Sequence, residues 1–220
     1  MPEFKRAVFI SIKPKYCYQI FTGEKTIEVR KNYPLKLKPP FDVYVYCTAP
    51  SHREHVNAAM TVSDDELYVH PKSGLKYGSS IELMCCDFNE YSRDNFSNGK
   101  CIGKFTVYGI QRLRYPEDKL VDVIDAKESC LTPKELINYA NGNPVYGWYI
   151  KDYELFGHPF TAKDFPTFKT IERPPQSWQY INIDTDALNA RKQYITADEY
   201  EERDRQMKKF YKSKGINYED

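Results

Sequence analysis

The residues best suited to chemistry lie near the start of the chain, where charged and aromatic side chains alternate with glycine and proline. The stretch 23–30 reads Gly-Glu-Lys-Thr-Ile-Glu-Val-Arg, and the stretch 11–16 before it reads Ser-Ile-Lys-Pro-Lys-Tyr. Lysine and arginine bind phosphate oxygens, a carboxylate orients an arginine or moves a proton, and a tyrosine ring stacks on a base. The pattern therefore suits a ligand that is both anionic and aromatic.

The charge of the chain is uneven along its length. The whole protein has 32 Lys and Arg against 31 Asp and Glu, which excludes a histone-like polycation. Residues 1–50 nevertheless hold nine basic and four acidic residues. Such a local basic patch suits a phosphodiester. The plainer alternative stays open: Glu28 and Arg30 form an ion pair on a solvated strand face, and the lysines are ordinary surface charges.

Three short elements must position these residues. Apolar residues on both faces predict a buried strand over 7–12. Pro14 and Gly23 bracket a helix over 14–22, because proline suits the first helical position and glycine suits a left-handed C-terminal cap. A second strand is expected over 25–31. Its apolar face holds Ile27 and Val29, and its polar face holds Thr26, Glu28 and Arg30.

The rest of the chain predicts an α+β fold whose mostly antiparallel sheet is curled into a barrel, with short connecting helices and a helical tail. A capping box at 132–135 opens a helix that ends at 141–142, and a second box at 196–199 opens a charged tail helix. We expect a barrel domain over 1–183 and a helical extension over 184–220. Residues 49–79 form a polar, irregular insertion with one short strand at 67–69. Further strands are expected over 43–47, 81–88, 102–113, 147–156 and 179–183.

Composition sets the broad class of the protein. Hydrophobic residues are 41% and charged residues 29%, as in globular proteins, and no apolar run is long enough to cross a bilayer. The N-terminus lacks a secretory pattern, so we expect a cytoplasmic protein whose six cysteines are reduced. The pattern Cys47, His52 and His55 has no evident fourth zinc ligand. We therefore expect neither a metal nor a cofactor.

The motif resembles a known family. Gly23, Lys25, Glu28 and Arg30 fit the G-x-K-x-x-E-x-R pattern of the ASCH domain, and residues 10–16 resemble the S-I-K-P-x-Y opening of that family. Residues 102–107 resemble a later strand more weakly. The ASCH family belongs to the PUA-like superfamily of small β-barrels, so the resemblance implies a barrel with a cleft lined by the motif.

The resemblance also implies binding of RNA or another single-stranded nucleic acid. The basic residues of the motif region would contact phosphate, Glu28 would orient Arg30 or accept a hydrogen bond from a base, and Tyr16 would stack. A segment over 173–180 presents Trp178 either as an aromatic wall or as packing for the end of the barrel. The candidate binding residues are Lys13, Lys15, Tyr16, Lys25, Thr26, Glu28, Arg30 and Trp178.

Two other functions remain as alternatives. Some ASCH proteins are ribonucleases or acetylcytidine amidohydrolases, so the same cleft would act as a hydrolase on RNA or on a modified nucleoside, with Lys25 and Glu28 as catalytic residues. The catalytic threonine of the amidohydrolases falls where this chain has Glu28, which weighs against that particular reaction. The third function is an adaptor that binds a partner protein through the tail helix.

Overall fold

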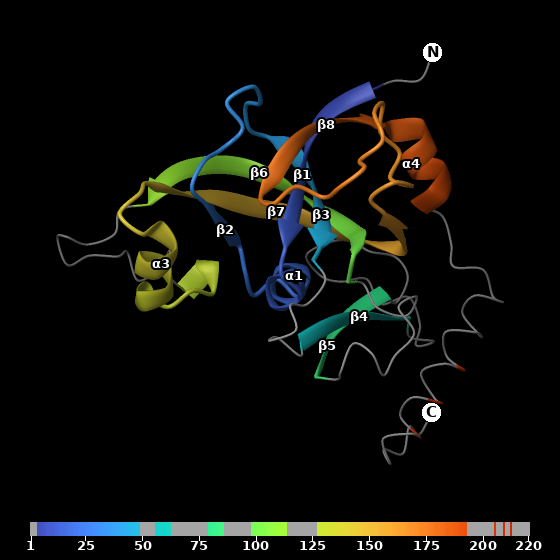
Figure 1. Ribbon diagram of the computed structural model, residues 1–220, viewed down its shortest axis with the longest axis horizontal. Helices are drawn as coiled ribbons and strands as arrows, with labels where there is room; N and C mark the ends of the chain where they lie inside the picture. The colour runs from blue at the N-terminus through green and yellow to red at the C-terminus, as the bar shows by residue number, and fades with distance from the viewer. Residues whose placement is uncertain are drawn as a thin grey trace.

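The computed structural model describes residues 4–48, 56–62, 79–85, 98–113 and 127–192, and the single residues 205, 209 and 212. Within these ranges, 56–62, 79–85, 157–158 and 190–192 are described by their backbone alone. Strands dominate the described part of the chain, and short helices follow β1, β6 and β8 (Figure 1). The strands are β1 Phe4–Ile12, β2 Ile27–Arg30, β3 Phe41–Cys47, β4 Val56–Val62, β5 Ser79–Cys85, β6 Lys100–Leu113, β7 Val145–Thr161 and β8 Trp178–Asp184. The helices are α1 Pro14–Phe21, α3 Pro133–Ala140 and α4 Thr185–Lys192.

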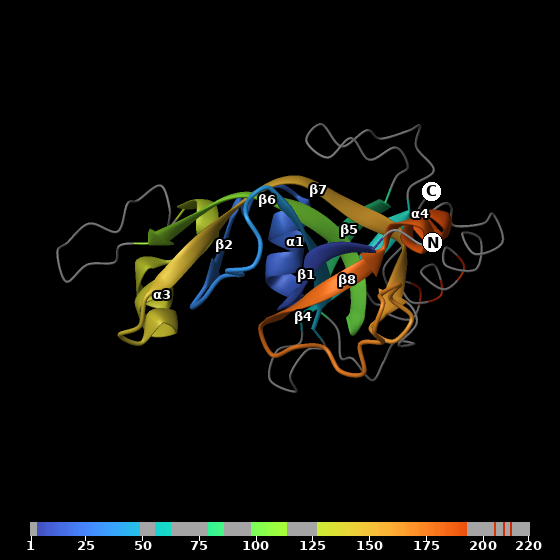
Figure 2. The ribbon, with the colours of Figure 1, turned by 90° about the horizontal axis from the view of Figure 1, so that it is seen from above.

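Six strands form one mixed sheet in the order β2-β7-β6-β3-β1-β8. The neighbours β1 and β3 run parallel, with Val8 opposite Val43, and the other four pairings are antiparallel. The expected mostly antiparallel α+β fold is therefore confirmed. The two long strands β6 and β7 carry several register shifts and curve along the molecule (Figure 2). Such bulges bend a sheet and increase its twist.

The expected closure into a barrel is wrong, because the edge strands β2 and β8 have no backbone ladder between them. Side chains connect these two edges instead. Arg30 at the end of β2 donates to the Ser177 hydroxyl just before β8, and the Trp178 indole donates to the Asn32 side chain. The Tyr180 hydroxyl also accepts a hydrogen bond from the Lys36 backbone N–H. We call this line of contacts between residues 30–36 and 177–180 the seam.

The core explains why α1 lies where it does. Cys17, Ile20 and Phe21 project from one side of α1 into a buried cluster that includes Trp148. Strand β1 is buried on both faces, as its apolar pattern predicted: Val8 belongs to this cluster and Phe9 to the cluster on the opposite face. Fully burying a side chain of this size stabilises a fold by roughly 1.5–3 kcal/mol. The sheet is thus anchored at the strand that leads into the motif.

The expected boundaries of α1 and the expected capping box of α3 are confirmed. Pro14 begins α1, and Gly23 has a φ of 82°, as a glycine cap requires. At α3 the Thr132 hydroxyl accepts from the Glu135 N–H at 3.2 Å, and the Glu135 carboxylate accepts from the Thr132 N–H at 2.7 Å. Asn141 ends this helix in the left-handed conformation.

Some expectations differ from the structure or lie outside its described part. The insertion over 49–79 is not irregular throughout, because 56–62 pairs with 79–85 as a separate two-stranded sheet. Its small residues Ala58 and Ala59 gave only a weak strand signal. The expected strand 67–69 and nearly all of the tail helix lie outside the described residues, as do His52 and His55. Residues 185–192, which follow β8 directly, form a helix that lies within the expected extension over 184–220 but begins before the expected capping box at 196–199. The division at residue 183 stays a prediction.

Two further observations concern the cysteines and the length of the helices. Cys17, Cys47 and Cys101 are buried free thiols, and Cys130 is partly exposed. None of the helices in the described part of the chain is long and apolar enough to span a lipid bilayer.

Gly103 tests the packing between α1 and the curved strands. A methyl group there would press against the Glu154 carbonyl oxygen, which belongs to the backbone of β7, and would lie 2.7 Å from the Phe21 ring, which is buried in the core. We expect Gly103→Ala to lower the free energy of unfolding by about 3 kcal/mol in urea titrations. The matched control is Gly109→Ala on the same strand, where the nearest atom lies 3.9 Å away. Equal stability of the two variants would contradict this packing.

Candidate functional site

The motif residues are held by backbone contacts on both sides of the Gly23 turn. The Gly23 N–H donates to the Ile20 carbonyl, and the Lys25 N–H donates to the Gln19 carbonyl at 2.8 Å. Ile27 and Val29 are then buried against Leu113 and Leu136. Because strand residues alternate in direction, Glu28 and Arg30 must project to the opposite face. The predicted division of this strand into two faces is confirmed.

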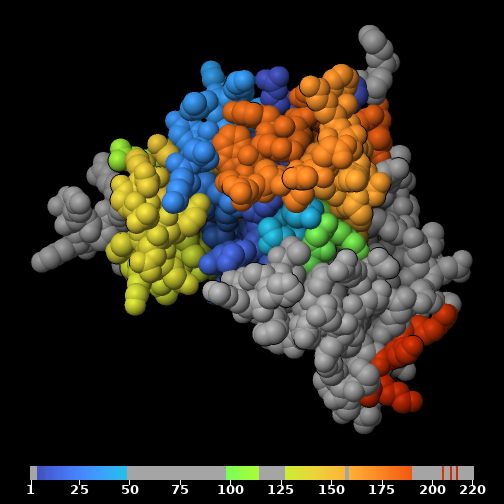
Figure 3. Space-filling model, in the orientation of Figure 1, coloured from blue at the N-terminus to red at the C-terminus, as the bar shows by residue number. Residues whose placement is uncertain are grey.

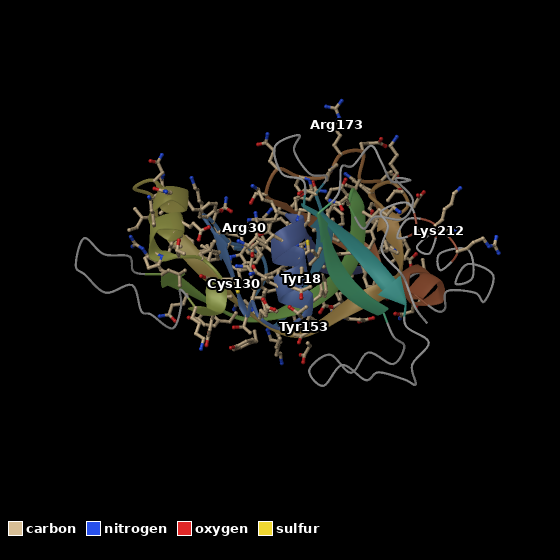
Figure 4. The ribbon with its side chains drawn as sticks, turned by 90° about the horizontal axis from the view of Figure 1, so that it is seen from below. Tyr18, Arg30, Cys130, Tyr153, Arg173 and Lys212 are labelled. Atoms are coloured by element: carbon tan, nitrogen blue, oxygen red, sulfur yellow. The ribbon has the colours of Figure 1, made fainter. Side chains whose placement is uncertain are left out.

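A cleft of about 520 Å³ opens on that face. Its walls come from the end of β1, the start of α1, strand β2, helix α3 and the segment before β8. Figure 4 shows Arg30 between α1 and α3. Residues lining the cleft are Ser11, Ile12, Lys13, Tyr16, Lys25, Glu28, Val29, Arg30, Thr48, Leu131, Glu135, Asn138, Tyr139 and Gln176.

Lys25 is a buried cation at the floor of the cleft, with 2% of its surface exposed. Its ammonium donates a hydrogen bond to the Ser129 carbonyl oxygen and lies 3.6 Å from a Glu28 carboxylate oxygen. The ammonium also lies 5.2 Å from the centre of the Tyr16 ring, within cation–π range. Burial lowers the pKa of Lys25, and the nearby Glu28 carboxylate opposes part of that shift. A buried amine of this kind can change its charge closer to neutral pH than a surface lysine.

Glu28 and Arg30 form an ion pair that is largely buried. Nε of Arg30 lies 2.9 Å from Oε1 of Glu28, and the two side chains are only 11% and 8% exposed. Nη2 of Arg30 donates to the Ser11 carbonyl at 2.8 Å, and Nη1 donates to the Ser177 hydroxyl at 3.3 Å. The guanidinium thus joins β2 to β1 and to the segment before β8. We call these contacts of Arg30 with Glu28, Ser11 and Ser177 the clamp. The N–H groups of the guanidinium that they leave unused are the ones that can contact a ligand.

Residue Ser11 completes this clamp. Its hydroxyl donates to the Pro175 carbonyl, and its backbone N–H donates to the Ser177 carbonyl at 2.9 Å. The rigid Pro-Pro segment is therefore tied to the start of the motif region, and this contact brings Gln176 to the cleft.

Five of the eight predicted binding residues line the cleft, namely Lys13, Tyr16, Lys25, Glu28 and Arg30. The structure does not bring the other three to its wall. Lys15 is exposed and lies 5.8 Å from the Tyr16 ring centre, and Thr26 connects the Glu128 carbonyl to the Ile150 N–H through its backbone. Trp178 packs edge-on against Trp148 at 5.9 Å. Trp178 was expected either to form an aromatic wall or to pack at the end of the barrel, and its contact with Trp148 matches the packing role.

The wall formed by α3 was missed by sequence reasoning. Glu135, Asn138 and Tyr139 have the i, i+3, i+4 spacing that places them on one helix face, so their mutual proximity was readable. Nothing in the sequence connected that face to a motif one hundred residues earlier. Burial raises the pKa of the Tyr139 phenol, so the hydroxyl keeps its proton. The hydrogen bond from the Thr132 backbone lowers the pKa of Glu135.

No metal site is apparent in this part of the protein. Among the residues that the structure describes, no three His, Cys, Asp or Glu side chains gather as metal ligands. The cleft brings together a buried amine, a buried ion pair, two phenol rings, two amides, the exposed Lys13 and the Glu135 carboxylate.

Three solved structures have a fold similar to that of this protein. The crystal structure of ASCH from Zymomonas mobilis matches with a TM-score of 0.53 and 16% identity, over 84% of this chain and 94% of that one. The protein has the fold of an ASCH domain. Two mutants of the Zymomonas mobilis protein match with a TM-score of 0.54 at 15% and 16% identity, covering 84% and 86% of this chain and 98% of theirs. No family model and no curated protein matches the sequence.

Arg30 is the residue that tests the clamp. Replacing it by methionine leaves the buried Glu28 carboxylate with Lys25 as its remaining cation and removes the donor to the Ser11 carbonyl. We expect Arg30→Met to lower the free energy of unfolding by about 3 kcal/mol, measured in urea. Arg173→Met is the matched control, because Arg173 is exposed and a surface change of this kind alters stability by only about 0.5 kcal/mol. An Arg30→Met protein as stable as the control would show that the clamp is dispensable.

Proposed function

We propose that this protein binds single-stranded RNA and that the cleft receives one unstacked nucleotide of the strand. The observation that carries the proposal is the meeting, in one cleft, of cations with two tyrosine rings and two side-chain amides. Tyr16 comes from α1 and Tyr139 from α3, and Asn138 and Gln176 supply the amides. Proteins bind unpaired bases with this combination of stacking surfaces, hydrogen-bonding groups and positive charge.

The size of the cleft fits such a ligand. A volume of about 520 Å³ lies within the range of pockets that hold small molecules. Side-chain amides both donate and accept hydrogen bonds, as the edge of a base requires. Lys13 is exposed at the junction of β1 and α1, where it can reach a phosphate outside the cleft. The base would thus enter the cleft while the phosphate stays at its rim.

The acidic residues in the cleft do not oppose this arrangement strongly. Glu28 is balanced by Arg30 and Lys25, which both lie within ion-pair distance. The Glu135 carboxylate accepts hydrogen bonds from the backbone and hydroxyl of Thr132. The lining thus holds three cations, Lys13, Lys25 and Arg30, against the two carboxylates of Glu28 and Glu135, and Lys13 is the exposed cation that an approaching phosphate meets. The ASCH-like fold is compatible with nucleic-acid binding and supports the proposal.

The test is a fluorescence titration of a labelled single-stranded RNA, and of the matching DNA, at low and moderate salt. Tyr139→Ala should weaken RNA binding roughly tenfold, since one stacked base contributes about 1–3 kcal/mol. Lys13→Glu should weaken binding and reduce its salt dependence. Lys151→Glu is the control, because Lys151 is exposed on β7 and does not line the cleft. Absence of RNA binding by the unaltered protein, or equal loss in all three variants, would overturn the proposal.

A hydrolase in the same cleft is the second candidate function, and the state of Lys25 favours it. Residues with perturbed pKa values in clefts are often catalytic, because a general acid or base works best with a pKa near the working pH. Lys25 has a lowered pKa and lies next to a carboxylate and a phenol ring. Its neutral amine could accept a proton from a nucleophile during cleavage of RNA or of a modified nucleoside.

The pH dependence separates binding from hydrolysis. The Lys25 ammonium exists below its pKa and is lost above it, and burial places this change below the ordinary lysine pKa of 10.5. We expect RNA affinity to fall as pH rises through that range, whereas hydrolysis by the neutral amine would rise. Binding and the integrity of RNA on denaturing gels are measured at each pH. The pH dependence of binding or of hydrolysis should disappear in Lys25→Met. A pH dependence that persists in this variant would show that a titratable group other than Lys25 causes it.

A further inference from the structure

A second concave surface lies beside β8, separate from the cleft. It has a volume of about 370 Å³, and we call it the β8 groove. Figure 3 shows the segments 165–184 (orange) and 31–40 (light blue) side by side on this face of the molecule. The β8 groove is lined by Arg6, Lys36, Thr167, Phe168, Lys169, Thr170, Ile171, Gln179, Tyr180, Ile181 and Asn182.

The charge of this groove is of one sign. Arg6, Lys36 and Lys169 are exposed, and no acidic residue belongs to the lining. Other basic residues nearby are paired: Lys5 contacts Asp42 at 2.8 Å, and Lys163 lies 4.0 Å from Glu172. For the three groove cations, the described residues provide no carboxylate within ion-pair distance. An unbalanced group of cations in a concave surface attracts an anion.

Aromatic rings lie next to these cations. Phe168 is 63% exposed and packs edge-on with Phe4, which is 41% exposed, at 5.2 Å between ring centres. The Lys36 ammonium lies 5.9 Å from the centre of the Tyr180 ring. Exposed rings among cations offer stacking surfaces for bases, which an acidic peptide would not use.

Backbone hydrogen bonds hold the groove in shape. The Phe168 N–H donates to the Asn182 carbonyl at 2.8 Å, and the Asp184 N–H donates to the Pro166 carbonyl at 2.9 Å. Arg6 on β1 lies directly opposite Asn182 on β8. The loop that carries Phe168 and Lys169 is therefore fixed to the edge of the sheet, so the backbone positions of these two residues are set beside Arg6.

We propose that the β8 groove is a second nucleic-acid site, which holds the phosphodiester backbone of the same strand whose nucleotide occupies the cleft. This inference rests on the proposed function. The two sites share one segment, because Gln176 lines the cleft and Tyr180 lines the groove. Four extended residues span about 13 Å, a distance that a few nucleotides can cover. The strand would cross the seam between the two sites.

Ligand length separates the two sites. A nucleoside monophosphate is too short to span both sites and is expected to bind in the cleft, whereas a labelled 12-nucleotide RNA reaches both. We expect Lys169→Glu and Phe168→Ala each to weaken binding of the long RNA roughly fivefold and to leave the monophosphate affinity unchanged. The salt dependence of long-RNA binding should also decrease in Lys169→Glu by about 0.7 in the logarithmic slope. Lys151→Glu is again the charge-matched control.

Each other outcome overturns the inference in a recognisable way. If the groove variants bind long RNA as tightly as the unaltered protein while Tyr139→Ala binds it weakly, the proposed function stands without the groove. Equal loss of monophosphate and long RNA in Lys169→Glu would indicate a general effect on the fold. Displacement of the RNA by an equal concentration of a polyglutamate peptide would assign the groove to acidic peptides. If neither RNA nor monophosphate binds the unaltered protein, the proposed function fails as well.

Discussion

The guanidinium of Arg30 connects parts of this protein that the backbone leaves apart. Its neighbours are the Glu28 carboxylate, the Ser11 carbonyl and the Ser177 hydroxyl, which belong to β2, to β1 and to the segment before β8. A buried ion pair costs desolvation energy and is retained only when its geometry is good and further hydrogen bonds satisfy its polar atoms. Arg30 meets part of that requirement, because Nη1 and Nη2 donate hydrogen bonds while the buried Nε has only its ion-pair contact with Glu28, and the cleft is built around this group.

The seam also explains the shape of the sheet. Strand β2 has only four residues, and α1 fills the core between β1 and β2 with apolar side chains. The sheet curves far enough for its edges to approach, but side chains rather than a backbone ladder join them. The cleft shares Arg30 with the seam, and the β8 groove shares Lys36 and Tyr180 with it, so both concave surfaces open beside the residues that join the two edges.

The cations of this region divide into two kinds by their surroundings. Lys25 and Arg30 are buried and hold carboxylate or carbonyl partners, so they organise the floor of the cleft. Lys13 at the rim and Arg6, Lys36 and Lys169 in the β8 groove are exposed. Exposed cations contribute little to stability, whereas they dominate attraction of a polyanion. The basic patch that the first fifty residues predicted is thus partly structural and partly available to a ligand.

The sequence by itself determined the local elements around the motif and the separation of its faces. Pro14, Gly23 and the capping box at Thr132 act within one or two helical turns, and the alternation of Ile27, Glu28 and Val29 assigns each side chain to a face without knowledge of the rest. Only the tertiary structure decided that α3 faces the motif, that Trp178 packs on Trp148, and that the sheet stays open. Those outcomes depend on contacts between residues distant in the chain, whose free energies come from packing geometry rather than from local residue preference.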